Sequence, residues 1–315
     1  MSSNSKPRLS LEASTLLAYA TVSLFWGSTY LAIRIGVRYM PPALFASSRF
    51  LLAGLLMLAY ARLTSQPLPT RPVDWRTNII VGLLLLAVGN GLVVWGEQFV
   101  ESGLAAIFIV TSPLWMVLFA ATLPGIRYRP TPVQLTGLLI GFAAAVSLIG
   151  IDLEELRGAD WRGPLAILCA AASWSLGSVY SQRNPISSGP VVNSALQMLA
   201  GGIALAIAGL LRGEWQRIEW SWEGLAAVLY LTIFGSIVSF TAYVYLLDHW
   251  PAPIVASSTY LNVVVAVFLG WLILDETVTV RMLIATGVIF AAVAMVRASK
   301  PVDLGRGSEE TTDSS

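Results

Sequence analysis

The sequence predicts an all-α membrane protein with about ten transmembrane helices as two inverted five-helix repeats. Hydrophobic residues make up 56% of the 315 residues and charged residues only 12%, about half of their share in a soluble domain. The apolar residues form runs of roughly twenty, the length that a helix needs to cross a bilayer. Charged and proline-rich breaks separate these runs. We therefore expect the chain to cross the membrane repeatedly.

The helix boundaries follow from reading the apolar runs against the breaks. Pro41-Pro42, the stretch 64–76 and Pro130 mark boundaries in the first half, and the longest polar connection, 152–162, divides the chain. The predicted helices are 13–35, 42–62, 77–97, 102–123, 132–151, 163–182, 189–211, 224–246, 252–274 and 279–297. The first five helices form a repeat over 13–151, and the last five form a second repeat over 163–297. Polar tails precede and follow them at 1–12 and 298–315.

The two halves are related in sequence. At a spacing of 150 residues, the following pairs recur: Gly27 and Gly177, Ser28 and Ser178, Tyr30 and Tyr180, Thr136-Gly137 and Thr286-Gly287. Each half opens with a tryptophan-containing helix and closes with a Thr-Gly helix. Because five helices per half is an odd number, the second half must enter the membrane from the opposite side. Inverted repeats of this kind recur in secondary transporters, whose substrate site lies near the midplane between the repeats.

An even number of helices places both termini on the same side of the membrane. Basic residues are somewhat more numerous on that side than on the other. The positive-inside rule therefore predicts that both termini are cytoplasmic. The small excess is typical of a protein of dual-oriented ancestry.

The scarcity of reactive side chains excludes several classes of function. With one cysteine, Cys169, and one histidine, His249, the chain lacks the ligands of a histidine-cysteine zinc site or a bis-histidine haem. Both lysines, Lys6 and Lys300, lie outside the apolar runs, and no G-x-x-x-x-G-K-[ST] motif occurs. We therefore expect no cofactor and no metal. The formal net charge of +1 gives no indication of a nucleic-acid partner.

Polar and large aromatic residues near the middle of the predicted helices are candidate substrate-binding groups. A polar side chain at that depth either pairs with a neighbour or faces a cavity. The candidates from the two halves are Trp26, Ser28, Asn90, Thr111 and Ser112, and then Trp174, Ser178, Ser239, Tyr260 and Asn262. The alternatives are helix packing for the serines, interhelical pairing for the asparagines and core packing for the tryptophans.

Arg49 is the single basic residue within a predicted helix core. It either extends to the membrane surface or pairs near the helix end, or it binds an anionic group of the substrate. Glu97 and Glu101 flank the turn between the third and fourth helices. Their carboxylates either lie at the membrane interface or serve as proton-binding sites. No acidic residue lies at a helix midplane, so we do not expect a built-in carboxylate proton relay. Pro113 frees a backbone carbonyl within the fourth helix.

Several motifs resemble those of a known family. The segments 26–30 (Trp-Gly-Ser-Thr-Tyr) and 33–34 resemble the opening motif of the EamA-type transporters in the drug/metabolite transporter superfamily. Residues 49–54 resemble the second helix of these transporters, and 88–91 and 275–277 extend the resemblance. It covers about Ser14 to Arg297 and is closest to the YedA-like exporters. The chain departs from the pattern at Asn262-Val263, where Asn-Pro is frequent, and at Gly125-Ile126, where Gly-Glu is common.

The resemblance implies a bacterial inner-membrane exporter of small metabolites, often amino acids or drugs, with a cavity lined by helices one, three, four, six, eight and nine. Rocking of the two repeats would alternate the exposure of the substrate. The expected partners are a small-molecule substrate and the lipid bilayer, while the oligomeric state stays open. A passive pore or lipid scramblase is the alternative function. An intramembrane enzyme is disfavoured, because no midplane aspartate pair or lysine is present.

Overall fold

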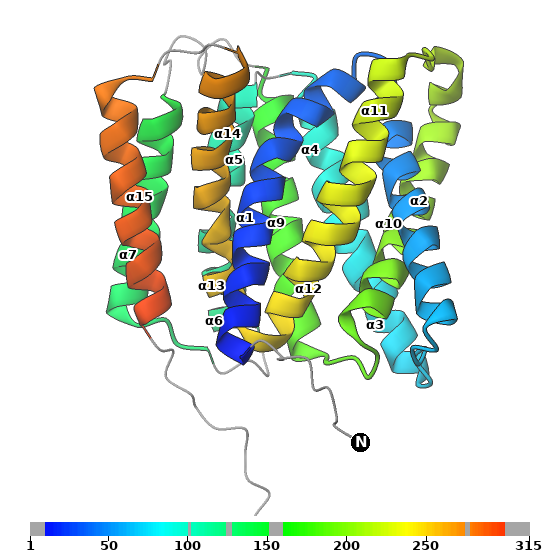
Figure 1. Cartoon of the computed structure of the whole chain (residues 1–315), viewed down its shortest axis with the longest axis horizontal. Helices are drawn as coiled ribbons and strands as arrows, with labels where there is room; N and C mark the ends of the chain where they lie inside the picture. The colour runs from blue at the N-terminus through cyan, green and yellow to red at the C-terminus, as the bar shows by residue number, and fades with distance from the viewer. Residues whose placement is uncertain (1–9, 100–101, 124–127, 151–159, 275–277, 300–315) are drawn as a thin grey trace, which may run out of the picture.

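The computed structural model describes residues 10–99, 102–123, 128–150, 160–274 and 278–299, and within these ranges it is a helical bundle without β-strands (Figure 1). The described residues leave out Glu101, Gly125-Ile126, residues 152–159 of the polar connection, the motif 275–277 and most of the two polar tails. The first and last described residues lie on the same face of the bundle, which we call the terminal face.

The first half crosses the bundle five times, and its third and fourth crossings are interrupted helices. Its elements are α1 (Leu11–Gly36), α2 (Pro42–Leu63), α3 (Pro72–Gly82), the π-helical η1 (Leu83–Asn90), α4 (Gly91–Gly96), α5 (Ser102–Ile109), α6 (Ser112–Thr122) and α7 (Pro132–Ile149).

The second half repeats this order, with interruptions in its third and fourth crossings again. Its elements are α9 (Arg162–Arg183), α10 (Pro190–Leu211), the short 3₁₀ turn η2 (Glu214–Arg217), α11 (Trp222–Tyr230), the π-helical η3 (Leu231–Val238), α12 (Ser239–His249), α13 (Ala252–Ala256), α14 (Ser258–Leu274) and α15 (Val280–Ala298).

The helix count agrees with the sequence prediction. Within the described residues, nine helical spans are long and apolar enough to cross a membrane, and α1, with 26 residues, is longer than a crossing requires. The main difference in boundaries is the third crossing, which begins at Pro72 instead of residue 77. Pro72 suits the first turn of a helix, and Arg71 pairs with Asp74 at 2.8 Å across that turn.

Corresponding helices of the two halves pack against each other in opposite directions, as an inverted repeat requires. Along the α2–α10 pair, the contacts run as follows: Leu44 with Gly209, Leu51 with Gly202, Gly54 with Leu199, and Ala61 with Val192. Residue numbers rise along α2 while they fall along α10, so the two helices are antiparallel.

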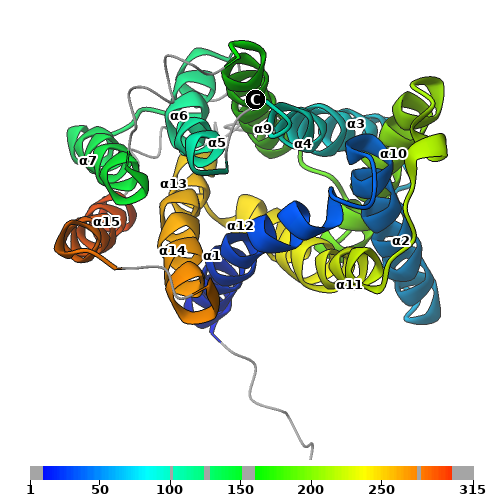
Figure 2. The same cartoon turned by 90° about the horizontal axis from the view of Figure 1, so that it is seen from above.

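The last helices of the two halves, α7 and α15, form a second antiparallel pair. The Gln134 amide donates to the Ser299 carbonyl at 2.9 Å near one end, and Gly150 lies beside Arg281 near the other. Figure 2 shows this pair at one edge of the bundle and α2 with α10 at the other. The central space between the two pairs holds α1, α9, α12 and α14.

The interruptions fall at matching places in the two halves. The π-helical segments η1 and η3 are eight residues each and occupy the third crossing of each half. The fourth crossings break between α5 and α6, just before Pro113, and between α13 and α14, at Ser257. Pro113 therefore directly follows a break in its crossing, and the corresponding crossing of the second half breaks ahead of Asn262-Val263. π-Helical turns are rare and frequently occur at functional sites.

We expect Gly82→Ala to destabilise the fold, because α3 touches α10 at this position. A Cβ atom on Gly82 would lie 2.3 Å from the backbone oxygen of Gln197. The expected loss is about 1–3 kcal/mol in the free energy of unfolding, measured by denaturant unfolding in detergent. Gly287→Ala in α15 is the matched control, because a Cβ there meets nothing within 4 Å. Equal stability of the two variants would contradict the backbone contact.

Candidate functional site

A cavity of about 140 Å³ lies between the two halves. Its walls come from α1, α2, η1, α4, α5 and α6 of the first half and from α9, η3, α12, α13 and α14 of the second. Its polar lining residues are Thr29, Arg49, Asn90, Ser112, Ser258, Thr259 and Asn262. Its aromatic lining residues are Trp26, Phe50, Trp174, Phe240 and Tyr243.

The structure brings six of the candidate residues together around this cavity. They are Trp26, Arg49, Asn90, Ser112, Trp174 and Asn262. Three of the others make hydrogen bonds away from it: Ser28 with Phe25 and Tyr230, Thr111 with Phe108, and Ser239 with Phe234. For these three, the packing alternative describes the observed contacts.

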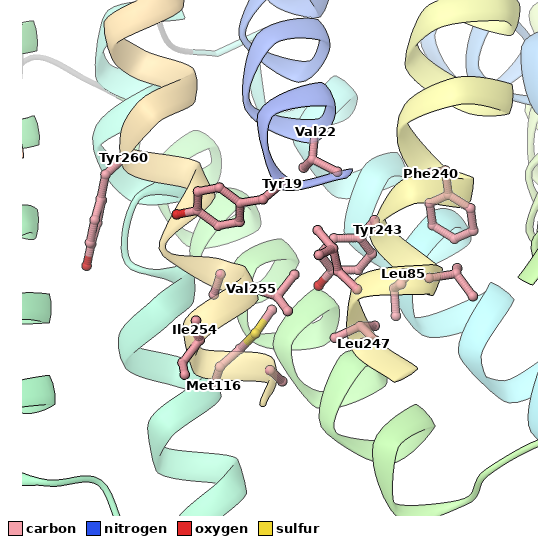
Figure 3. Close-up of a cluster of buried hydrophobic side chains, with 14 of the residues drawn as sticks. Tyr19, Val22, Leu85, Met116, Phe240, Tyr243, Leu247, Ile254, Val255 and Tyr260 are labelled. Atoms are coloured by element: carbon pink, nitrogen blue, oxygen red, sulfur yellow. The ribbon is translucent and has the colours of Figure 1, made fainter. Parts of the chain in front are cut away.

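Tyr260 and Ser178 also lie outside the lining. The Tyr260 ring is fully buried, and its hydroxyl donates to the Leu138 carbonyl of α7 at 2.9 Å. Figure 3 shows this ring on the side of α14 that faces away from Tyr243. Tyr260 therefore anchors α14 to α7. Ser178 lies behind the cavity wall, where its hydroxyl is 2.7 Å from that of Tyr243.

Two tryptophans from the first helices of the two halves meet at the cavity. The rings of Trp26 and Trp174 are 5.4 Å apart in an edge-to-face arrangement, a favourable geometry for aromatic pairs. The Trp26 indole N–H donates to the Gly235 carbonyl of η3 at 3.0 Å, and that of Trp174 donates to the Tyr243 hydroxyl at 2.9 Å. Because both N–H groups are satisfied within the protein, the rings offer a ligand an apolar surface.

Tyr243 completes this aromatic cluster and is absent from the candidate list. Its ring centroid lies 5.0 Å from that of Trp26 and 5.6 Å from that of Trp174. The sequence prediction ended this helix at 246, which places Tyr243 near a membrane surface. The helix extends to His249, so Tyr243 lies deeper. No local signal distinguishes Tyr243 from Tyr230 and Tyr245 on the same predicted helix.

Asn262 lines the cavity and also ties α14 to α1. With its amide nitrogen turned toward two carbonyl oxygens, it donates to Ser23 and to Ser258 at 3.0 Å each. The two helices touch at Gly27, where a Cβ atom would lie 2.7 Å from the Asn262 backbone oxygen. The glycine of the repeated Gly-Ser motif therefore permits the helix contact beside the cavity.

Arg49 is buried and does not extend to the surface, so the snorkelling interpretation is wrong. Its residue exposure is 4%, and one of its terminal nitrogens donates to the Asn90 side-chain oxygen at 2.6 Å. Its guanidinium lies over the Phe50 ring, 4.4 Å from the centroid. Its Nε atom is buried without a hydrogen-bond partner among the described residues. A buried cation in a membrane costs about 2.5–3.5 kcal/mol, so this placement requires a compensating role.

Glu97 caps the end of α4, just past the membrane-spanning part of the third crossing. Burial raises the pKa of its carboxyl group to about 7, and the positive charge of Arg49 opposes this rise. The carboxylate is therefore electrostatically linked to the cavity cation. Below a pH of about 7 Glu97 is mainly neutral, and above it the group carries a negative charge.

A cluster of buried apolar side chains is packed beside the cavity. The cluster in Figure 3 includes Val22, Met116, Leu247, Ile254 and Val255, all of which are buried. Beside them, the Tyr19 hydroxyl lies 2.7 Å from that of Ser257 and links α1 to the break between α13 and α14. We call this set the terminal plug. These apolar residues belong to one cluster with Met116, Phe240 and Tyr243 of the cavity lining.

Comparisons with known proteins identify relatives for both halves. Residues 13–150 and 161–298 each match the model of the EamA-like transporter family. The chain is 41% identical over 279 residues to the "Uncharacterized inner membrane transporter YedA" of Escherichia coli strain K12, covering 88% of each protein. It is 28% identical over 235 residues to "Protein PagO" of Salmonella typhimurium, covering 74% of this chain and 76% of that protein.

A more distant relative and a solved structure extend the likeness. The "Uncharacterized transporter YoaV" of Bacillus subtilis is 21% identical over 280 residues, covering 89% of this chain and 95% of that protein. One crystal structure matches with a TM-score of 0.73 and 24% identity, covering 90% of this chain and 97% of that chain. This structural likeness shows the fold alone.

We expect Arg49→Met to raise the pKa of Glu97 further above 7, because the variant removes the positive charge that stabilises the carboxylate. Infrared difference titration of the protonated carboxyl band measures this shift, and Glu97→Gln identifies the band. Arg62→Met is the matched control, because Arg62 is an exposed residue on the same helix. An unchanged Glu97 titration in Arg49→Met would contradict the electrostatic link.

Proposed function

Because the chain belongs to the EamA-like transporter family, we propose that it exports small organic metabolites, such as amino acids, related compounds or drugs, by alternating access. The chain is a multi-pass membrane transporter and not an enzyme. Its location is the bacterial inner membrane, the location that the name of the YedA relative gives for that protein. We place the terminal face in the cytoplasm, in line with the positive-inside rule.

The observation that carries the proposal is the central cavity shared by the two halves. Trp26 and Trp174 come from the first helix of each half and meet there at 5.4 Å. A site between repeats of opposite orientation is the arrangement through which secondary transporters alternate access. A tilt of one half against the other would move the two rings apart on one side, so that the cavity opens there. On the other side the tilt would bring the halves together, so that the cavity closes.

The interrupted helices support such a movement. Gly235 in η3, Asn90 in η1 and Ser112 at the start of α6 line the cavity at or beside a helix interruption. Irregular backbone at membrane depth is tolerated where it lines a cavity or is buried in protein. Opening toward the terminal face would require Tyr19 and Ser257 to part, because their hydroxyls join the two sides of the terminal plug.

The lining also limits the kind of substrate. Aromatic faces would hold an apolar body, while amide and hydroxyl groups would bind polar substituents. The cavity volume of about 140 Å³ is similar to that of protein cavities that hold one benzene molecule. Small organic compounds with one apolar portion suit this space better than nucleotide sugars or peptides.

We expect Trp26→Ala and Trp174→Ala to reduce transport roughly tenfold or more, because each removes an aromatic wall of the binding site. The measurement is counterflow in proteoliposomes preloaded with pooled amino acids, sugars or small drugs. Trp222→Ala is the control, because the Trp222 side chain is 83% exposed at the start of α11. Wild-type rates in both cavity variants at normal folded abundance would refute the site assignment.

The same vesicles test the passive pore and the lipid scramblase. A carrier gives transient accumulation of labelled substrate above protein-free vesicles, whereas a pore gives only leak that does not saturate. Accelerated flipping of labelled lipids without solute counterflow would favour a scramblase. Secretion of the identified compound by intact cells that express the protein, and its retention by cells that carry Trp26→Ala, tests the direction of transport.

A further inference from the structure

We propose that the cavity selects compact organic monoanions, and that Arg49 binds their carboxylate group. The inference rests on the proposed function, since it assigns the substrate class of that cavity. Arg49 lies in the cavity lining with 4% exposure, and its Nε atom is buried without a partner. Such a cation, placed at membrane depth in the wall of a cavity, is suited to an anionic ligand.

No carboxylate of the described residues forms an ion pair with Arg49, and Glu97 acts on its charge only at longer range. Among the described residues, the ion pairs are Arg71–Asp74 and Arg162–Asp160, and neither involves Arg49. The side-chain hydrogen bond of Arg49 goes to the neutral amide of Asn90. A guanidinium group carries five N–H donors, and a carboxylate can accept two of them side by side. The unused donors therefore match a carboxylate that enters from the cavity.

Asn90 and Phe50 hold the guanidinium in place for this role. The hydrogen bond of 2.6 Å to Asn90 fixes one edge of the planar group, and the Phe50 ring supports one of its faces at 4.4 Å. A ligand that meets a prepositioned arginine loses less conformational entropy than one that must order the side chain. These contacts also explain why Arg49 stays inside instead of reaching the membrane surface.

The rest of the lining limits the ligand to one negative charge and an apolar body. The other polar lining residues are uncharged: Thr29, Asn90, Ser112, Ser258, Thr259 and Asn262. A second carboxylate would lack a cation, while a hydrocarbon or aromatic portion would contact Trp26 and Trp174. The volume of about 140 Å³ accommodates a body of about the size of benzene.

The first test compares benzoate with benzamide, which has nearly the same shape but no charge. Binding to the full-length wild-type protein in nanodiscs is measured with labelled benzoate and competing unlabelled compounds. We expect benzoate to bind roughly tenfold or more tightly than benzamide, because only the carboxylate forms charge-assisted hydrogen bonds. Benzylamine, which carries the opposite charge, is expected to compete least. Equal competition by benzoate and benzamide would overturn the proposal.

Variants then assign this preference to one residue. In Arg49→Gln, the ratio of benzoate to benzamide affinity is expected to fall toward one, and Arg49→Lys is expected to keep part of it. Arg62→Gln on the exposed part of α2 is expected to keep the wild-type ratio. The ratio is read only from variants that elute as folded protein. An unchanged ratio in folded Arg49→Gln would show that Arg49 serves the helix contact with Asn90 and not the ligand.

The binding readout separates this inference from the proposed transport. Benzoate preference without counterflow of any solute would support the anion site and refute the carrier function. Counterflow of neutral or cationic compounds, with no preference for benzoate over benzamide, would support the carrier and refute the anion site.

Discussion

A helix that is interrupted inside a bilayer exposes backbone groups that lipid cannot satisfy, and this constraint governs the centre of the bundle. Both π-helical segments receive side-chain donors from the first helix of the opposite half. Trp26 donates to the Gly235 carbonyl in η3, and Ser173 donates to the Leu84 carbonyl in η1 at 2.8 Å. The groups that line or border the cavity therefore also stabilise the irregular backbone. At Trp26, one hydrogen bond therefore joins the cavity wall to the distorted helix.

The second constraint is electrostatic, because the cavity contains a cation in a region of low polarity. Arg49 is oriented by Asn90 and linked at longer range to Glu97. An anionic ligand and an ionised Glu97 would act on the same positive charge.

The crossings could be predicted from the sequence because apolar length and polar breaks are one-dimensional signals. The depth of a residue in the membrane could also be predicted, from its position along the helix. Four residues chosen for their depth line the cavity: Trp26, Asn90, Trp174 and Asn262. The direction in which a side chain points could not be predicted, because both faces of a membrane helix are apolar. Tyr260 has the right depth but points to α7.

Arg49 shows the same limit in a different form. Its presence in the helix core was evident from the sequence, but its partner was not, because Asn90 lies on another crossing. Neither the π-helical segments nor the matching break at Ser257 has a distinct residue signal, whereas Pro113 does. Helix interruptions without proline depend on tertiary contacts, so they could not be predicted from local sequence.

The antiparallel contact between α2 and α10 imposes a reciprocal limit on the evolution of the two halves. Leu44 meets Gly209 and Leu51 meets Gly202, so one step along α2 is matched by one step back along α10. An inserted residue in either helix would displace the large-to-small pairing on one side of the insertion. The sequences of the two halves can diverge freely in their loops, but these two helices must keep their lengths. A larger side chain on one helix must be matched by a smaller side chain at the facing position of the other.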